Sequence, residues 1–564
     1  MENQPHIKDI LSQMKVRNLI SRREWLAAIS VAVGLTIILA LPYVLGYAFA
    51  GPDLTFTGIL MNPEDTQSYF AKMLQGYDGQ WLYRIPFTVE EHDPALLGGL
   101  YPLLGHIARL FGLSLDAIWN LSRFISSVIL FVTTFAFIAT YLPDRRERWS
   151  AYLLAILGSG LGWLLFIINQ PYWLGAFPVD FKMPEAHLFF SALTFPHGML
   201  GTALLLASFV FIKKALNSNN GAWLFAILAG LSNLLLGIIY PFLIYLIAVT
   251  YGVYWLFRLY LGRRIEWLDT GLLAVALIIP LPLYIYYYYT YQVNEIFRTW
   301  ADQAVTTSPA IPHFIIAYGP LLLLALLPLF INKKKGSNRG STTLLWSWII
   351  AASLLIYAPI NPQRRFVQGV QVPLSILGAI GIYQVFLPWL MGTRLFQRVL
   401  NRPRYSIEGL ERLTVVAIIA ILALSNIYVL ASMSITAAIQ KPYPFFREKD
   451  EVAAVEWLRN QDGPRTAVIS AYETGNFIGA RAGKPVLVGH WAETAFWEDK
   501  LDKAMTFYQD ETSDRWRIDL LDQYGIGFVW YGTMERLLGD FDPLSADYLF
   551  LVYSHGDVNI YGVR

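Results

Sequence analysis

The chain has 564 residues, of which 55% are hydrophobic and only 15% are charged. This composition excludes an ordinary soluble globular protein. The net charge of +2 says little as a total, no basic stripe points to nucleic acid as a partner, and the lack of cysteine excludes disulfides, thiol nucleophiles and cysteine-ligated metals.

The chain begins with a polar segment, residues 1–24, which is too long ahead of the first apolar stretch for a cleaved signal peptide. Long apolar stretches then follow one another, and each is near the 20 residues or so that cross a bilayer. The fold class predicted is a polytopic α-helical membrane protein, because a β-barrel would show shorter, alternating segments. We predict about eleven spans, near residues 25–50, 117–141, 150–169, 188–212, 221–238, 240–260, 267–290, 313–331, 342–360, 367–390 and 413–438.

Lysine and arginine gather in alternate loops, as in "PDRRERW" (143–149) and "RLFQRVLNRPR" (394–404). The positive-inside rule places these loops and the N-terminus in the cytoplasm. Because eleven is odd, the chain after residue 438 is expected outside. The predicted domains are thus a cytoplasmic segment 1–24, a membrane domain 25–438 with a long first outer loop 51–116, and an extracytoplasmic domain 439–564.

Residues 439–564 have the composition of a small α/β domain. The stretch "EKDEVAAVEWLRNQ" (448–461) predicts an amphipathic helix. Five stretches predict strands: "TAVISA" (466–471), "PVLVG" (485–489), "GIGFVWYG" (525–532), "LFLVYS" (549–554) and "DVNIYGV" (557–563).

The first outer loop opens with a helix signal. Asn62 is expected to cap a helix whose first turn holds Glu64 and Asp65 and which ends near Gly76, with apolar residues spaced to lie in the membrane interface. Acidic residues in a first turn complement the helix dipole and need no other role. A carboxylate at the outer membrane surface is also suited to deprotonate an acceptor hydroxyl as a general base.

With its stretch "PEDTQSY" (63–69) in that loop, the chain resembles the GT-C superfamily of membrane glycosyltransferases, which includes protein O-mannosyltransferases and the aminoarabinose transferase of lipid A. The resemblance covers residues 1–438 and implies a polyprenyl-phosphate-linked sugar as donor. It maps the catalytic acid onto Asp65 or Glu64, of which we favour Asp65. The order Glu-Asp departs from the Asp-Asp or Asp-Glu pair of the family.

A closer resemblance, over nearly the whole chain, is to bacterial membrane proteins of GT-C type. It is carried by "AKMLQGYDGQWLY" (71–83), "GSGLGWLL" (158–165), "FPHGMLG" (195–201), "NPQRRF" (361–366) and "TGNFIGARAGKPVLVGHWAET" (474–494). In the last stretch His490, Trp491 and Glu493 are candidate acceptor contacts, although glycines near a strand end usually only make turns.

The second outer loop holds Asp180, Glu185 and His187. Oxygen ligands with one histidine suit Mg²⁺ or Mn²⁺, and in GT-C enzymes an acidic residue of a later loop joins the first one. A solvated loop is the alternative. His197, inside the next predicted span, is either a binding residue or a structural histidine beside Pro196.

Arg364 and Arg365 lie at an outer helix end, where the positive-inside rule disfavours them. Guanidinium groups bind phosphate in pairs of hydrogen bonds, so we assign them to the donor phosphate, with contact to lipid headgroups as the alternative. Arg298 is a weaker candidate for the same role. His92, in the acidic cluster "VEEHD" (89–93), is a further candidate substrate contact.

The function predicted is transfer of a sugar from a polyprenyl-phosphate donor to a glycan, lipid or protein acceptor, at the outer face of a bacterial plasma membrane. We expect an inverting, hexosyl-transferring enzyme. Two other functions stay open: a transporter or flippase of lipid-linked glycans, and a non-catalytic assembly protein whose outer domain binds a partner.

Overall fold

The computed structural model describes residues 20–218, 220–330, 339–400, 402 and 405–564. The chain forms two compact units, and each is described by itself. Unit 1 consists of the described residues of Met1–Ala40, Arg123–Tyr284 and Thr306–Ser432. Unit 2 consists of Leu41–Ser122, Ile285–Val305 and Met433–Arg564.

Within the described ranges, seven helical segments are long and apolar enough to cross a membrane. They are α2 (Arg22–Phe49), α5 (Leu115–Ala139), α10 (Pro196–Leu216), α11 (Ala222–Ile239), α12 (Leu243–Gly262), Ile311–Phe330 with α16 (Ile311–Leu326), and Gln363–Met391 with α18 (Gln371–Gly381) and α19 (Leu387–Met391). Two bent pairs raise the number to nine if each is one span: α13 (Trp267–Ile278) with α14 (Leu281–Val293), and α21 (Ile407–Leu422) with the helical stretch Leu424–Gln440 that contains α22 (Leu424–Ile435). The chain is therefore a multi-pass membrane protein, as predicted.

The remaining two of the eleven predicted spans fall on shorter helices. In the span predicted at 150–169, α6 (Arg145–Leu157) stops at Gly158, and a separate short helix, α7 (Trp163–Ile167), follows. The break forms because the N–H groups of Gly160 and Gly162 donate to the carboxylate of Asp180, at 3.1 and 2.9 Å, instead of to helical carbonyls. In the span predicted at 342–360, the apolar helix covers only Thr342–Leu355 of α17 (Arg339–Leu355).

A buried ion pair ties α2 to α6 within unit 1. The guanidinium of Arg148 donates to both carboxylate oxygens of Glu24, at 2.9 and 3.0 Å, and its third nitrogen donates to two backbone carbonyls. Both side chains are almost fully buried. Further short elements of this unit are α8 (Val179–Lys182), η1 (Pro184–Ala186), α9 (Leu188–Ala192), η2 (Leu327–Phe330), η3 (Gln363–Val367), η4 (Ile382–Phe386) and α20 (Arg394–Leu400).

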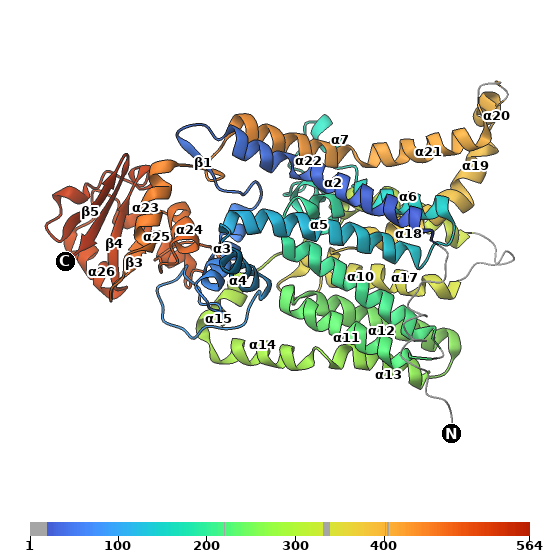
Figure 1. Cartoon of the computed structure of the whole chain (residues 1–564), viewed down its shortest axis with the longest axis horizontal. Helices are drawn as coiled ribbons and strands as arrows, with labels where there is room; N and C mark the ends of the chain where they lie inside the picture. The colour runs from blue at the N-terminus through green and yellow to red at the C-terminus, as the bar shows by residue number, and fades with distance from the viewer. Residues whose placement is uncertain (1–19, 219, 331–338, 401, 403–404) are drawn as a thin grey trace. The chain divides into compact units, whose positions relative to one another are not determined.

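The C-terminal part of unit 2 contains a sheet, in which Figure 1 labels β3, β4 and β5. It has four strands in the order β3-β4-β6-β5. The strands are β3 (Ala467–Ile469), β4 (Ile526–Tyr531), β5 (Leu549–His555) and β6 (Val558–Val563); β3 pairs parallel with β4, and the other pairs are antiparallel. Helices α23 (Lys449–Arg459), α24 (Tyr472–Arg481), α25 (Trp497–Phe507), α26 (Asp514–Gln523) and α27 (Thr533–Arg536) and the turn η6 (Pro543–Ser545) complete this part. The predicted strand 485–489 does not form: Val486 makes only an isolated bridge to Val468, and its N–H donates to the carbonyl of Pro86.

The first loop folds together with this C-terminal part inside unit 2. Strand β1 (Leu54–Phe56) pairs antiparallel with β2 (Phe446–Glu448). The helices of the loop, α3 (Pro63–Tyr77) and α4 (Leu100–Phe111), pack very closely against each other at Gly76 and Gly105. A Cβ atom at either glycine would lie within about 2.1 Å of the backbone of the facing helix. Helix α3 also packs against α24.

Burial of α3 corrects one expectation. The helix was expected to lie in the membrane interface, yet polar residues such as Gln67, Ser68 and Lys72 are buried along with its apolar ones. Protein rather than lipid thus surrounds most of α3.

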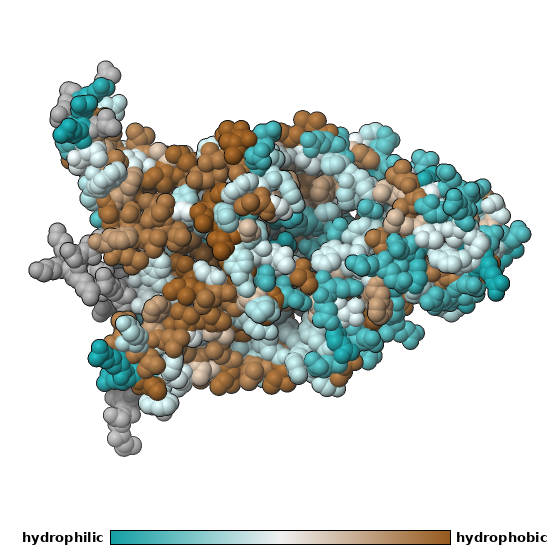
Figure 2. Space-filling model, turned by 180° about the vertical axis from the view of Figure 1, so that it is seen from behind, coloured by the Kyte–Doolittle hydropathy of each residue, from teal (hydrophilic) through white to brown (hydrophobic). Residues whose placement is uncertain are grey.

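Figure 2 shows apolar side chains gathered over the membrane helices and hydrophilic ones over the C-terminal sheet.

Candidate active site

Helix α3 presents two carboxylates in its first turn. Glu64 and Asp65 follow Pro63, whose fixed φ suits the start of a helix. The described side chain of Asn62 makes no capping hydrogen bond, contrary to expectation; the residue has a left-handed φ of 44°, which asparagine tolerates better than most residues. The Thr66 hydroxyl and N–H bond to the Asn62 carbonyl instead, at 2.8 and 3.0 Å. The carboxylates thus lie at the helix end that interacts favourably with negative charge.

A histidine far along the chain contacts Asp65. Nε2 of His490 lies 3.3 Å from Oδ1 of Asp65. The other ring nitrogen, Nδ1, accepts the N–H groups of Ala492 at 3.1 Å and of Glu493 at 3.3 Å. A nitrogen that accepts hydrogen bonds carries no proton, so the ring proton is on Nε2 and is donated to Asp65. The side chain of His490 is 3% exposed and that of Asp65 is 31% exposed.

A buried ion pair lies next to His490. Oε1 of Glu493 accepts hydrogen bonds from the Ser68 hydroxyl at 2.5 Å and from the Lys72 ammonium at 3.1 Å. Its other oxygen accepts the Tyr83 hydroxyl at 2.5 Å. Lys72 also donates to Ser68 at 2.6 Å and lies 3.9 Å from the centre of the Tyr83 ring. These four side chains satisfy one another and anchor the residues around His490 to α3.

The charges of this cluster are coupled. Burial raises the pKa of Glu493, but Lys72, His490 and the two hydroxyl donors outweigh burial and hold that pKa below its ordinary value. Burial lowers the pKa of Lys72, against the influence of Glu493. Burial also lowers the pKa of His490, but Asp65 and Glu493 outweigh it and hold that pKa above its ordinary value. Protonation of His490 would direct a second ring proton at two N–H donors, so the neutral ring fits the geometry at Nδ1.

The His490 loop, residues 487–496, is fixed from two further directions. The amide of Gln303 in α15 (Glu295–Gln303) donates to the carbonyls of Ala492 at 3.1 Å and Thr494 at 2.8 Å. On α24, a Cβ atom at Gly475 would lie 1.9 Å from the carbonyl oxygen of Val488, so only glycine allows this approach. The loop is therefore held by α3, α15 and α24 together.

Glu64 has a different partner. Its charge acts on the Tyr472 hydroxyl at the start of α24. Burial chiefly, with the charge of Glu64 second, raises the pKa of Tyr472. The structure thus places both predicted carboxylates against the C-terminal part of the chain, each with its own partner.

Two other predicted site residues of unit 2 are His92 and Arg298. In the described part of the chain the structure shows no contact of either side chain with Asp65. Nε2 of His92 accepts the N–H of Ile85 at 2.9 Å, and Nδ1 lies 2.8 Å from the carbonyl oxygen of Glu90. Burial lowers the pKa of His92. Its ring shapes the loop, and substrate contact by His92 stays a prediction. Arg298 lies on α15 with an exposed side chain, and its role stays a prediction as well.

An open pocket of unit 2 runs beside the "VEEHD" cluster. Carboxylates and aromatic rings line it together, among them Glu91, Asp93, Glu295, Tyr289 and Phe496. Phe496 is 52% exposed, and its backbone has a left-handed φ of 56°. Carboxylates and exposed rings are groups that sugars bind, but nothing else in this pocket identifies a ligand.

Unit 1 gathers the two predicted arginines near Tyr240. The Arg365 guanidinium lies 3.4 Å from the Tyr240 hydroxyl, and Arg364 and Glu185 are within electrostatic range of the same hydroxyl. Nε of Arg364 is buried and has no hydrogen-bond partner among the described residues. His197, the second residue of α10, packs its ring edge-on to Tyr240 with the centroids 5.0 Å apart. A compact cationic group at a helix N-terminus results, and phosphate binding by these residues stays a prediction.

One of the predicted metal ligands, Asp180, bonds to the backbone instead. Oδ2 of Asp180 accepts hydrogen bonds from the N–H groups of Gly160 and Gly162 and from the Ser425 hydroxyl at 2.8 Å, so Asp180 fixes the break after α6. His187 is fully buried, with Nε2 3.4 Å from Asp180 Oδ1. Among the described residues no group of three or more His, Asp or Glu side chains is arranged to hold a metal ion. The three residues therefore do not fit the Mg²⁺ or Mn²⁺ site expected from the sequence.

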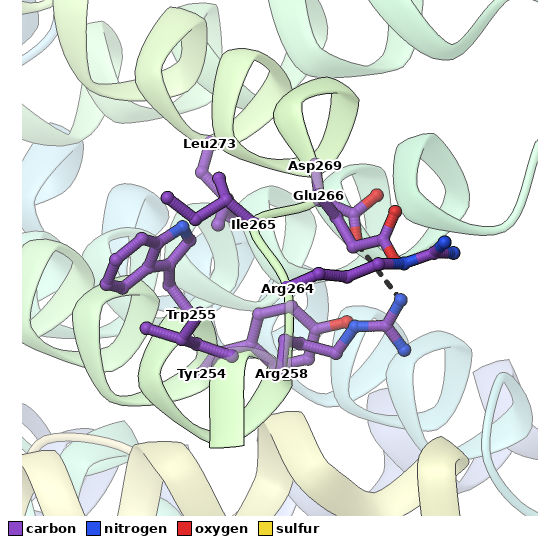
Figure 3. A pocket seen from close by; sticks show the side chains of 9 residues that line it. Tyr254, Trp255, Arg258, Arg264, Ile265, Glu266, Asp269 and Leu273 are labelled. Carbon is purple, nitrogen blue, oxygen red and sulfur yellow. Dashed lines mark hydrogen bonds and ion pairs between the residues drawn. The ribbon is translucent and has the colours of Figure 1, made fainter. Parts of the chain in front are cut away.

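A second, water-sized pocket in unit 1 lies between α12 and α13 (Figure 3). Its cations are paired: Arg258 lies 3.3 Å from Asp269, and Arg264 lies 2.9 Å from Glu266. The pocket has neither unpaired charge nor the volume for a substrate, so it is not the candidate site.

Comparison with known proteins identifies the fold. No protein-family model and no curated protein sequence matches the chain. Among solved structures, the Archaeoglobus fulgidus oligosaccharyltransferase tethered with an acceptor peptide covers 91% of this chain and 69% of its own, with a TM-score of 0.54 and 13% identity. ArnT from Cupriavidus metallidurans bound to undecaprenyl phosphate covers 96% and 98%, with a TM-score of 0.52 and 11% identity. The mycobacterial arabinofuranosyltransferase AftD covers 96% and 42%, with a TM-score of 0.54 and 12% identity.

This chain has the GT-C fold. All three similar structures are GT-C glycosyltransferases, so the resemblance predicted from "PEDTQSY" and the helical membrane architecture is confirmed at the level of fold. In this chain with the GT-C fold, the acidic start of α3 is the position to which the family resemblance assigns the catalytic acid.

Sequence reasoning missed most of the residues that hold the His490 loop in place. Ser68 and Lys72 are four residues apart and hence on one face of α3, but this signal alone names no partner. His490 and Glu493 were expected to contact an acceptor. In the structure His490 contacts Asp65, and Glu493 pairs with Lys72. No local pattern reveals Tyr83 or Gln303.

Proposed function

We propose that this protein is a glycosyltransferase that moves a sugar from a polyprenyl-phosphate donor to an acceptor hydroxyl. One observation supports this most: in a chain with the GT-C fold, Asp65 lies in the first turn of α3 with its carboxylate held by His490 and still partly exposed. A carboxylate that is both oriented and accessible is what a general base needs.

In the proposed reaction Asp65 takes the proton of the acceptor hydroxyl as its oxygen attacks the anomeric carbon. The bond between that carbon and the phosphate oxygen breaks, and the polyprenyl phosphate leaves with the electron pair. A single displacement of this kind inverts the anomeric configuration. We propose a hexose as the sugar, and Glu64, whose charge acts on Tyr472, as a neighbouring group rather than the base.

Arg364 and Arg365 are proposed to hold the donor phosphate and to stabilise the charge that develops on it. The cationic group around Tyr240, with the partnerless buried Nε of Arg364, supports this assignment. His197 at the start of α10 is proposed to contribute to the same site, and Arg298 is kept as a weaker candidate.

The orientation proposed follows from the lysine and arginine pattern of the loops. It places the N-terminus in the cytoplasm, and Asp65 with residues 439–564 on the outer face of a bacterial plasma membrane. Two similar structures support the proposed partners: ArnT is bound to undecaprenyl phosphate, and the A. fulgidus enzyme is tethered with an acceptor peptide.

The test is a transfer assay with the detergent-purified full-length protein, radiolabelled polyprenyl-phosphate sugars and a membrane extract as acceptor. Asp65→Asn is expected to lower kcat by about 10²- to 10⁴-fold, the usual contribution of a general base. Asp78→Asn, at the other end of α3 in an exposed pair with Arg459, is the matched control and should keep wild-type activity. NMR of the product would report the anomeric configuration.

Three results would count against the proposal. Full activity of Asp65→Asn would remove the base. Movement of a lipid-linked glycan across vesicles without transfer would favour a flippase. Wild-type protein that neither transfers sugar nor binds polyprenyl phosphate would favour an assembly protein.

A further inference from the structure

The bond between His490 and Asp65 has a defined polarity. Two backbone N–H groups of the His490 loop occupy Nδ1, at 3.1 and 3.3 Å, and leave Nε2–H as the donor to Asp65. The tautomer is thus set by the backbone of the loop, independently of Asp65.

The loop is built so that the imidazole is held in place. Glu493 is buried against Ser68, Tyr83 and Lys72, and Gln303 holds the carbonyls on either side of Glu493. Because Ser68 and Lys72 belong to the same helix as Asp65, the anchor fixes the distance from the loop to that helix. The polar cluster therefore orients His490 toward the first turn of α3.

We propose that His490 is a positioning residue for Asp65, so that the C-terminal part of the chain completes the active site. This inference rests on the proposed function. His490 donates Nε2–H, holds the carboxylate in one orientation and stabilises its ionised form, while the acceptor proton passes to Asp65 and not to the ring. The exposed third of the Asp65 side chain stays available to the acceptor hydroxyl.

Two substitutions separate positioning from a structural role. His490→Asn retains an acceptor near the position of Nδ1 for the loop N–H groups but lacks the donor to Asp65. His490→Gln retains a donor at the reach of Nε2 but loses the Nδ1 acceptor. If His490 positions Asp65, His490→Asn should lower kcat about 100-fold at nearly unchanged KM, since a misplaced catalytic group costs about that much. His490→Gln should lower kcat less than His490→Asn does. A merely structural histidine predicts the reverse order, and that result would overturn the inference.

The matched control is His555→Asn. His555 contacts Asp450 at 2.9 Å, with both side chains more exposed than those of His490 and Asp65, so it removes a second histidine–aspartate contact from unit 2 outside the site. It should leave transfer unchanged. Thermal unfolding of each variant checks that loss of transfer does not reflect loss of fold.

A second measurement does not depend on transfer. Deuterium exchange at C2 of His490, followed by mass spectrometry against pH, reports the protonation of the ring. The charged groups that act on it are Asp65, Glu493 and Lys72, and Asp65 favours the protonated form. Asp65→Asn should therefore move the His490 titration to lower pH, and Asp78→Asn should not.

The two measurements separate the two claims. Transfer by the wild type with no effect of Asp65→Asn on the His490 titration would overturn the positioning role and keep the proposed function. A clear effect on the titration, with a wild type that neither transfers sugar nor binds polyprenyl phosphate, would overturn the proposed function and keep the bond.

Discussion

Replacing Lys72 by Met should strongly destabilise unit 2, because it removes the ammonium group that pairs with the buried carboxylate of Glu493. The Lys72 and Glu493 side chains are 5% and 3% exposed. Removing one partner of such a pair costs about 3–5 kcal/mol, since the other charge stays buried. Glu493 would retain the hydroxyl donors Ser68 and Tyr83, so we expect the lower end, about 3 kcal/mol.

The cost should depend on pH with a definite sign. In the wild type the pKa of Glu493 is held below its ordinary value, so its contribution to stability is present above the unfolded pKa and is lost as the pH falls. Without Lys72, burial dominates and raises that pKa, so the variant loses stability as the pH rises. The difference in stability between wild type and Lys72→Met should therefore be largest at neutral pH and shrink toward pH 5.

The assay is thermal unfolding in detergent, followed by tryptophan fluorescence from pH 5 to 8. For a unit of about 150–250 residues each kcal/mol shifts the midpoint by about 2–4 °C, so we expect a fall of about 6–12 °C at pH 7.5. Lys503→Met, which removes an i,i+4 pair with the exposed Asp499, is the control and should cost less than about 0.5 kcal/mol. The double variant Lys72→Met with Glu493→Gln should be less destabilised than the sum of the two single variants. Additive effects, or a Lys72→Met shift within that of the control, would refute the reasoning.

Other expectations concern the remaining buried contacts. Arg148→Met should lower the unfolding midpoint of unit 1 by the equivalent of about 3–5 kcal/mol, because Glu24 is left buried without its partner, whereas Arg146→Met, in exposed pairs, should cost under about 1 kcal/mol in the same thermal scan. Gly475→Ala should lower both stability, by about 1–3 kcal/mol, and sugar transfer, because its Cβ would displace the His490 loop. Asp180→Ala should destabilise unit 1 by about 1–3 kcal/mol per N–H left unpaired, and added Mn²⁺ should stabilise neither it nor the wild type in thermal scans.

Local patterns were enough to predict the elements that depend on residues close to one another in the sequence. The helix at Pro63–Tyr77, the helix at Lys449–Arg459 and four of the five strands follow from periodicity and turn signals. The predicted strand 485–489 failed because its alternation could not show that its backbone turns toward Pro86. The span predicted at 150–169 failed because hydropathy does not record that Asp180 captures two glycine N–H groups.

The sequence by itself determined the membrane class, the approximate spans and the acidic helix start, because hydropathy, charge and the proline at the helix start act over a few residues. It also named Asp65, Glu64 and His490, but without relation to one another. Only the tertiary structure decided that His490 bonds to Asp65, 425 residues earlier, and that Glu493 is neutralised by Lys72. The physical reason is that the partner of a buried polar group is chosen by the packing of distant segments, and local spacing carries no record of that choice.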